Sequence, residues 1–203
     1  EQLHEPGART VMGRKYSQSG EAQGHAILSD LAAHPATARH IATKLARHFS
    51  SDTPPAALVA RLEASFIKTG GDLPSLYEVL VESPEPWQAP GAKFRQPWDW
   101  LVAVQRATGA AMPAQGGQFM LNQLGQPIWR PGSPAGWDDI SASWAAPDAL
   151  LRREELANPY ARALAPKLFP ETLSEGTRQA VARADSAQQA LALLFVSPEM
   201  LRR

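Results

Sequence analysis

The stretch HPATARHIATKLARHF, residues 34–49, predicts an amphipathic helix with one apolar face and one basic face. Pro35 suits the first turn of a helix, where its missing N–H would have had no intrahelical partner. The apolar positions recur at steps of three and four residues, which places them on a single stripe. They are Ala38, Ile41, Ala42, Leu45 and Phe49. We therefore expect a helix over residues 35–49 that packs onto the protein through this stripe.

The rest of the chain shows the same helical periodicity and no sustained alternation of apolar and polar residues. Gly70 and Gly71 separate two amphipathic segments, 55–69 and 72–82, which predicts an αα-hairpin. Further helices are expected over residues 21–33, 96–107, 119–124, 148–156, 174–182 and 186–195. Residues 1–20 predict an irregular lead-in. The expected fold is all-α, an irregular multi-helix bundle with αα-hairpins and little or no sheet.

Composition bounds the size and the partners of the protein. A chain of 203 residues is long enough to bury one core, so we expect a single helical domain over residues 1–203. Lys plus Arg equals Asp plus Glu at 20 each, so no net field attracts nucleic acid. Cysteine is absent, which excludes disulfides and thiolate metal sites. No apolar run approaches the ~20 residues of a membrane span, and we expect no cofactor.

The basic face of the 35–49 helix is the first candidate binding surface. Its side chains form two neighbouring rows at four-residue spacing. One row holds Arg39, Thr43 and Arg47, and the other holds His40, Lys44 and His48. No acidic residue lies between Asp30 and Asp52, so the face could bind phosphate, sulfate, a uronic acid or an acidic protein surface. The alternative is a solvated face or structural ion pairs with acids such as Glu63 or Glu78.

Metal binding by this face is not expected. His40 and His48 are separated by eight residues, which a helix spaces about 12 Å apart. A single zinc ion needs helical ligands at a spacing of three or four residues. A metal site would therefore require another histidine brought in by the fold.

The second candidate is a long segment over residues 125–147 that is rich in Trp, Pro and Gly. Connections of this length are usually functional or are held in place by their own side chains. A platform that stacks on a sugar and hydrogen-bonds its hydroxyls could be formed by Trp129, Trp137 and Trp144, with Asp138 and Asp139 beside the middle ring. The alternative is that the tryptophans, Trp144 included, fasten the loop and the aspartates are turn residues.

Catalysis has weaker support in the sequence. A glycosidase needs two carboxyl groups that face each other across the scissile bond, which neighbours such as Asp138 and Asp139 rarely do. No nucleophile elbow and no glycine-rich phosphate loop occurs. A hydrolase acting on a carbohydrate or an ester, with these aspartates and a histidine of the 34–48 region, remains the alternative from a different class.

One motif occurs twice. Residues 72–85 and 186–199 both begin with a helix cap, continue as an amphipathic helix and end in Ser-Pro-Glu at identical spacing. The first copy ends in Ser83-Pro84-Glu85 and the second in Ser197-Pro198-Glu199. Two copies are too few for a solenoid, where at least three units stack. The repeated motif predicts two helices that end in the same way.

These motifs resemble a bacterial family of uncharacterised helical proteins, the domain of unknown function eighteen hundred. The resemblance rests on the 34–49 stretch, both Ser-Pro-Glu motifs, and GQP at 125–127 leading to SPAGW at 133–137. It implies a helical fold, a C-terminal portion of a longer protein and a periplasmic or secreted location. It also implies a possible protein partner from a neighbouring family of exported, sulfatase-like proteins. It assigns no catalytic residue.

The functional prediction from the sequence is a non-enzymatic binding or assembly module. We expect it to contact an anionic polymer or a partner protein through the basic face of the 35–49 helix. The oligomeric state is left open by the sequence.

Overall fold

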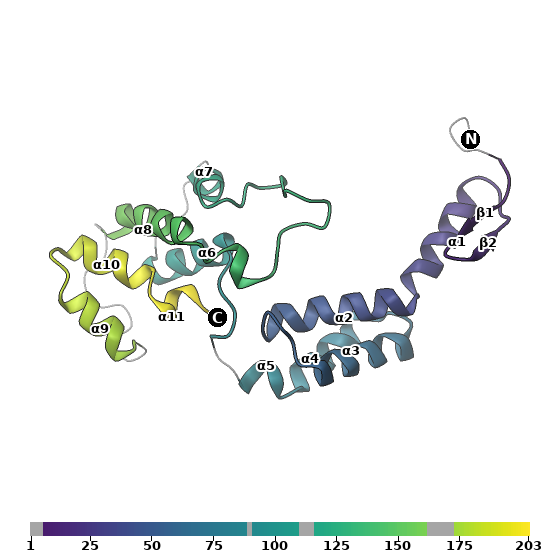
Figure 1. Ribbon diagram of the computed structural model, residues 1–203, viewed down its shortest axis with the longest axis horizontal. Helices are drawn as coiled ribbons and strands as arrows, with labels where there is room; N and C mark the ends of the chain where they lie inside the picture. The colour runs from purple at the N-terminus through teal and green to yellow at the C-terminus, as the bar shows by residue number, and fades with distance from the viewer. Residues whose placement is uncertain (1–5, 89–90, 110–115, 162–172) are drawn as a thin grey trace. The chain divides into compact units, whose positions relative to one another are not determined.

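The computed structural model describes residues 6–88, 91–109, 116–161 and 173–203, without the side chains of residues 158–161. The described residues form helices and one two-stranded sheet, so the predicted all-α class is confirmed (Figure 1). They divide into two compact units, Glu1–Gln88 and Ala89–Arg203, which are described separately below. The single domain expected from the sequence stays a prediction. None of the helices in the described ranges has the length and apolar character needed to cross a bilayer.

The first unit contains a short hairpin followed by five helices. The elements are β1 (Arg9–Val11), β2 (Arg14–Tyr16), α1 (Glu21–Ala32), α2 (Pro35–Phe49), α3 (Ala56–Thr69), α4 (Leu73–Glu82) and α5 (Glu85–Gln88). Helix α2 begins where the sequence predicts, because the Nδ1 atom of His34 accepts a hydrogen bond from the Ala36 N–H at 3.1 Å. It packs beside α3, and α3 packs beside α4 (Figure 1).

The hairpin β1–β2 differs from the irregular lead-in predicted for residues 1–20. Its strands pair antiparallel with Val11 opposite Arg14. Met12 and Gly13 form the two-residue connection, with φ angles of 47° and 81°. Two positive φ angles match the twist that a tight hairpin needs. This turn has a weak sequence signal, since methionine rarely occupies such a position and each strand has only three residues. Residues 1–5 lie outside the described ranges.

The core face of α2 is made of alanines. Ala38, Ala42 and Ala46 are fully buried against α3 and α4. Small side chains let helix backbones approach closely, so these alanines set the spacing between α2 and α3. Phe49, predicted as part of the buried stripe, is instead half exposed. Phe49 lies at the end of α2 and is not part of the core cluster that α2 forms with α3 and α4.

Helices α3 and α4 form the predicted αα-hairpin. Gly70 adopts a left-handed conformation with φ 69° at the end of α3, and the Gly71 N–H donates to the Phe66 carbonyl at 2.9 Å. A residue with a Cβ atom is strained in this conformation. Asp72 then caps α4 by accepting a hydrogen bond from the Ser75 N–H at 2.9 Å. Both ends of the turn therefore follow from local sequence.

The second unit contains α6 (Pro97–Thr108), α7 (Gly116–Gln123), the 3-10 turn η1 (Ser141–Ser143), α8 (Pro147–Ala161), α9 (Glu175–Ala182), α10 (Ala187–Phe195) and α11 (Pro198–Leu201). Its core gathers side chains from α6, α7, α8, α10 and α11. The buried indole of Trp100 donates to the Phe195 carbonyl at 2.9 Å and so joins α6 to α10. Residues 93–95 pair antiparallel with the last residues of the chain through Phe94 and Arg202.

Both Ser-Pro-Glu motifs have the same structural role. Each serine is buried, each proline lies at or just before the start of a short helix, and each glutamate bonds another helix. Glu85 accepts from Arg61 of α3 at 2.5 Å, which lowers the pKa of Glu85. Glu199 accepts from the Ser174 N–H at 2.7 Å and from the Thr177 hydroxyl at 3.0 Å. The repeated motif is therefore a device that ends one helix and fastens it to another.

Candidate functional site

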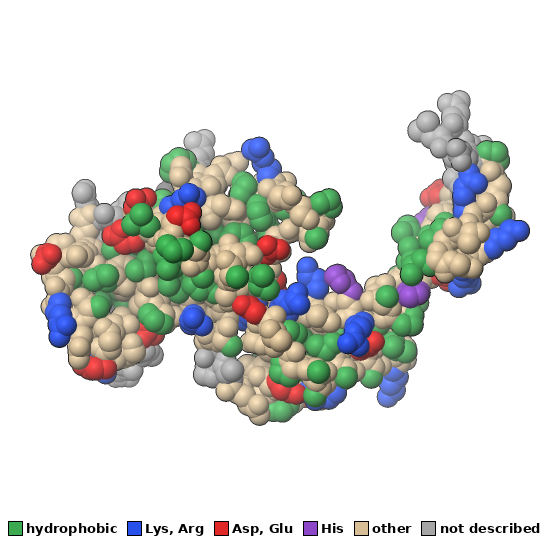
Figure 2. All heavy atoms as spheres, viewed as in Figure 1, with side chains coloured by type: hydrophobic (Ala, Val, Ile, Leu, Met, Phe, Trp, Pro, Cys, Tyr) green, Lys and Arg blue, Asp and Glu red, His purple; other side chains and the backbone are tan. Residues whose placement is uncertain are grey.

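The basic face of α2 borders a shallow hollow in the surface of the first unit. The hollow has a volume of about 440 Å³ and is lined by Ala36, Arg39, His40, Thr43, Lys44 and Arg47. Lysine, arginine and histidine side chains gather over α2 (Figure 2). Five of the six polar residues predicted for this face thus share one surface. The sixth, His48, lines a different hollow, described below.

Two of the three fixed cations have structural partners. The Arg39 guanidinium lies 3.2 Å from the Glu63 carboxylate on α3, which is one of the two acids that the sequence suggested as partners. The Arg47 Nε donates to the Asp52 carbonyl at 3.2 Å and holds the turn after α2. Arg39 nevertheless keeps 71% of its side chain exposed, and an exposed pair of this kind contributes little to stability.

Lys44 and His40 are exposed, as Arg39 is. Among the described residues neither makes an ion pair, and Thr43 turns its hydroxyl back to the Arg39 carbonyl at 2.7 Å. The acid that pairs with this face through a side-chain contact in the described ranges is Glu63, which lies beside Arg39. No group of three or more metal-binding side chains occurs in the described ranges. The arrangement is one that can bind an anion at the surface.

An apolar groove lies next to this face. It has a volume of about 640 Å³ and is lined by Leu45, His48, Phe49, Tyr77, Leu80, Val81, Pro86 and Trp87. The residues come from the end of α2, from α4 and from α5. The sequence did not predict this groove, because Phe49, Tyr77 and Val81 fit helical stripes that are typical of a core. The sequence did hold one indication of the groove. The apolar stripes of α2 and α4 contain more apolar residues than one neighbouring helix can cover.

The tryptophan segment is fastened to the second unit by two of its three rings, because Trp144 belongs to the core cluster and Trp137 packs against that cluster. The Trp144 side chain is buried and its indole donates to the Asp138 carbonyl at 2.9 Å. Trp137 packs against Trp144, with ring centroids 6.1 Å apart. Trp129 is 94% exposed and has a left-handed φ of 57°. Residues 125–146 contain the turn η1 and otherwise neither helix nor strand.

The two aspartates of the segment hold the loop in place. The Asp139 carboxylate lies 3.4 Å from the Lys93 ammonium, and its carbonyl accepts from the same ammonium at 2.5 Å. Lys93 is 3% exposed, so this is a buried ion pair. The Asp138 carboxylate accepts from the Ser143 hydroxyl at 2.8 Å. These contacts favour the interpretation of the aspartates as fasteners, whereas their role in binding a ligand stays a prediction.

The two aspartates and the histidines predicted to act with them lie in different units. The histidines of residues 34–48 belong to the first unit, and Asp138 and Asp139 belong to the second. Asp139 is committed to a buried lysine, and the adjacent Asp138 is bonded to a serine. Both aspartates are therefore engaged in contacts that hold the loop, and a catalytic role for them stays a prediction.

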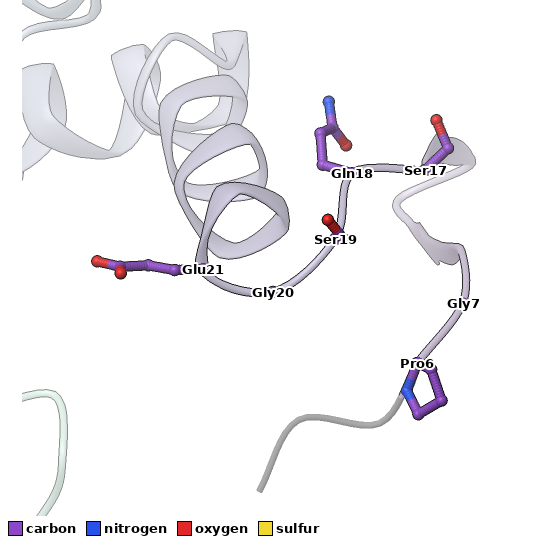
Figure 3. A pocket seen from close by; sticks show the side chains of 7 residues that line it. All are labelled: Pro6, Gly7, Ser17, Gln18, Ser19, Gly20 and Glu21. Carbon is purple, nitrogen blue, oxygen red and sulfur yellow. The ribbon is translucent and has the colours of Figure 1, made fainter. Parts of the chain in front are cut away.

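A third hollow lies where the hairpin meets α1. It has a volume of about 500 Å³ and is lined by Pro6, Gly7, Ser17, Gln18, Ser19, Gly20 and Glu21. The side chains point in different directions and do not converge on one point (Figure 3). Below the surface, the buried amide of Gln23 donates to the carbonyls of Gly7, Tyr16 and Gln18. This cluster is explained by its structural role, because Gln23 holds the hairpin against α1.

A buried arginine is the most unusual charge in the second unit. Arg153 is 1% exposed, lies 4.6 Å from the Phe94 ring centroid and 5.6 Å from that of Trp100, and donates to the Arg95 carbonyl at 2.9 Å. Within the described part of the chain, its Nε and one terminal nitrogen have no hydrogen-bond partner. Burial lowers the pKa of Arg153 to about 10. Its two aromatic neighbours are members of the core cluster, so we assign Arg153 to the core.

Comparison with known families agrees with the sequence resemblance. Residues 1–202 match the family described as Protein of unknown function (DUF1800), which covers essentially the whole chain. No curated protein and no solved structure matches the chain. The comparisons therefore provide a family and no activity. On this match, the chain belongs to the DUF1800 family of proteins of unknown function.

Proposed function

We propose that the chain is a non-enzymatic binding module that recognises an anionic polymer or an acidic partner through the basic face of α2. The observation that carries the proposal is the charge balance of the hollow on this face. Arg39, Lys44 and Arg47 line it, and Glu63 is the acid paired with it in the described residues. The net positive charge of the hollow attracts an anion. The cations stay in contact with solvent, so the site needs no buried, unpaired cation.

The shape of the surface supports a polymer or a protein rather than a small substrate. The hollow is shallow and runs along a helix whose lining residues span positions 36–47. At 1.5 Å per residue this corresponds to about 16 Å of helix. A surface of this length suits several anionic groups in succession, such as the sulfates or carboxylates of a polysaccharide. Export and a sulfatase-like partner, both expected from the family resemblance, remain part of this proposal.

The test is retention of the chain on a sulfonated cation-exchange matrix at pH 7. The double variant Arg39→Gln/Lys44→Gln removes two exposed cations from the hollow. The matched control, Lys15→Gln/Lys68→Gln, removes two exposed cations of the same unit elsewhere. We expect the first variant to elute at clearly lower salt than the control, with both melting temperatures close to that of the wild type. Equal elution of the two variants would refute the proposal.

A further inference from the structure

We infer that the apolar groove beside the basic face binds the hydrocarbon part of a single-chain amphiphile whose anionic head lies against Lys44. This inference rests on the proposed function, because it uses the same basic face for the head. It adds a second site, the groove, and names the chemical class of the ligand. All the residues involved belong to the first unit.

The groove has the composition of a binding site for an apolar group. Its volume of about 640 Å³ lies within the range of ligand pockets, roughly 300–1,000 Å³. Three aromatic rings line it, from Phe49, Tyr77 and Trp87. The Trp87 indole is held in place, because its Nε1 donates to the Val81 carbonyl at 3.0 Å. The floor of the groove includes Leu80, which is buried in the core of the unit.

The walls of the groove leave apolar surface in contact with water. Val81 is 62% exposed and Trp87 is 70% exposed, and Phe49 and Tyr77 are each about half exposed. Single exposed apolar residues are normal on protein surfaces, but several that line one concavity mark a binding site. Covering them with hydrocarbon removes this surface from water, which is favourable in proportion to the area covered.

The position of the groove relative to the charges determines the ligand class. Lys44 lines the basic hollow, and His48, one helical turn later, lines the groove. Residues four apart on a helix are neighbours on its surface, about 6 Å apart. The boundary between the two surfaces is therefore the Lys44–His48 row. A ligand with a carboxylate at Lys44 can place the first carbons of its chain in the groove.

Two other occupants fit the observations less well. A neutral apolar molecule would fill the groove but leave the adjacent cations unused. A small inorganic anion would meet the cations but leave the aromatic walls exposed. An amphiphilic anion satisfies both surfaces at once, and no acidic residue occurs on α2 to repel its head.

The experiment is an NMR titration of the full chain labelled with ¹⁵N, with decanoate, butyrate and decanol as probes. We expect decanoate to shift the amide signals of Lys44 and of the groove residues, together with the Trp87 indole signal. Each buried methylene strengthens binding about four-fold, so two or more buried methylenes make decanoate at least ten-fold tighter than butyrate. Decanol should shift the groove signals and leave the Lys44 signal unchanged.

Two variants and one matched control assign the site. Val81→Glu places a charge in the groove at a position exposed enough to tolerate it, and it should weaken decanoate binding at least ten-fold. Ile67→Glu makes the same change on α3, at a residue that is 55% exposed and outside the groove, and it should leave the affinity unchanged. Lys44→Gln should weaken decanoate about three-fold, as befits one exposed charge, and leave decanol unaffected.

Several results would overturn the inference. Absence of shifts with decanoate, shifts elsewhere in the chain, or equal affinity for butyrate and decanoate would each remove the groove as the hydrocarbon site. Binding of an acidic amphipathic peptide to the groove in place of decanoate would identify a protein partner instead. Retention on the anionic matrix is unaffected by these outcomes. The titration can therefore refute hydrocarbon binding in the groove without refuting anion binding by the basic face. Retention on the cation-exchange matrix tests the basic face separately.

Discussion

Glu199 in the second Ser-Pro-Glu motif provides a quantitative test of how the second unit is held together. Its carboxylate accepts hydrogen bonds from the Ser174 N–H and the Thr177 hydroxyl, at the start of α9. Burial acts to raise the pKa of Glu199, but hydrogen bonds from Ser174 and Thr177 outweigh it and hold the pKa at about 2. The ordinary pKa of a glutamate is about 4.3.

The magnitude and the sign follow from proton linkage. A carboxyl group with a lowered folded-state pKa stabilises the fold above its unfolded-state pKa, and this contribution is lost as the pH falls towards 2. The full shift would correspond to about 3 kcal/mol. Glu199 is partly exposed, and solvent screens such contacts, so we expect about 1–2 kcal/mol.

The assay is chemical denaturation followed by circular dichroism from pH 7 to pH 3. Glu199→Gln should lower the free energy of unfolding by about 1–2 kcal/mol at pH 7. The gap to the wild type should narrow below about pH 4.3, because the wild-type carboxylate then loses its advantage over the neutral amide. Glu155→Gln, an exposed change on α8, is the control and should have no effect. A Glu199→Gln variant as stable as the wild type at pH 7, or a stability difference independent of pH, would show that the hydrogen bonds to Glu199 do not stabilise the unit.

Five further substitutions test the second unit, each by denaturation. Arg153→Met should keep or raise the free energy of unfolding, because it replaces a buried charge with an apolar chain, whereas Arg153→Ala should lower it by about 2–4 kcal/mol through the cavity it leaves. Trp144→Ala should cost about 3–5 kcal/mol, while Trp129→Ala at the exposed tip should change stability by less than about 0.5 kcal/mol. Asp139→Ala should cost about 3 kcal/mol, because it takes the carboxylate from a buried Lys93. A neutral Trp144→Ala or Asp139→Ala would contradict the assignment of these residues as fasteners of the loop.

Helix positions were predictable because their signals are local. Pro35 and the His34 cap fix the start of α2, and Gly70 with Asp72 fixes the turn between α3 and α4. Each signal acts within about four residues, so it can be recognised without knowledge of the rest of the fold. The hairpin β1–β2 escaped prediction because its turn uses Met12, a residue that avoids positive φ angles in most proteins.

The surroundings of the candidate sites were not predictable in the same way. Phe49 fits the apolar stripe of α2 by spacing, but its burial depends on whether another helix covers the end of α2. The pair of Lys93 and Asp139 joins residues 46 positions apart, and no local pattern links them. The basic face was foreseen because all its members lie on one helix. The groove was missed because it needs α4 and α5 as well.

Anion binding by the basic face of α2 can be measured as an affinity for a sulfated polymer. Isothermal titration of the full chain with dextran sulfate, at several salt concentrations, compares Arg39→Gln/Lys44→Gln with Lys15→Gln/Lys68→Gln. We expect weaker binding and a shallower salt dependence for the first variant alone, because fewer counterions are released. Equal affinity and equal salt dependence for the two variants would contradict this expectation.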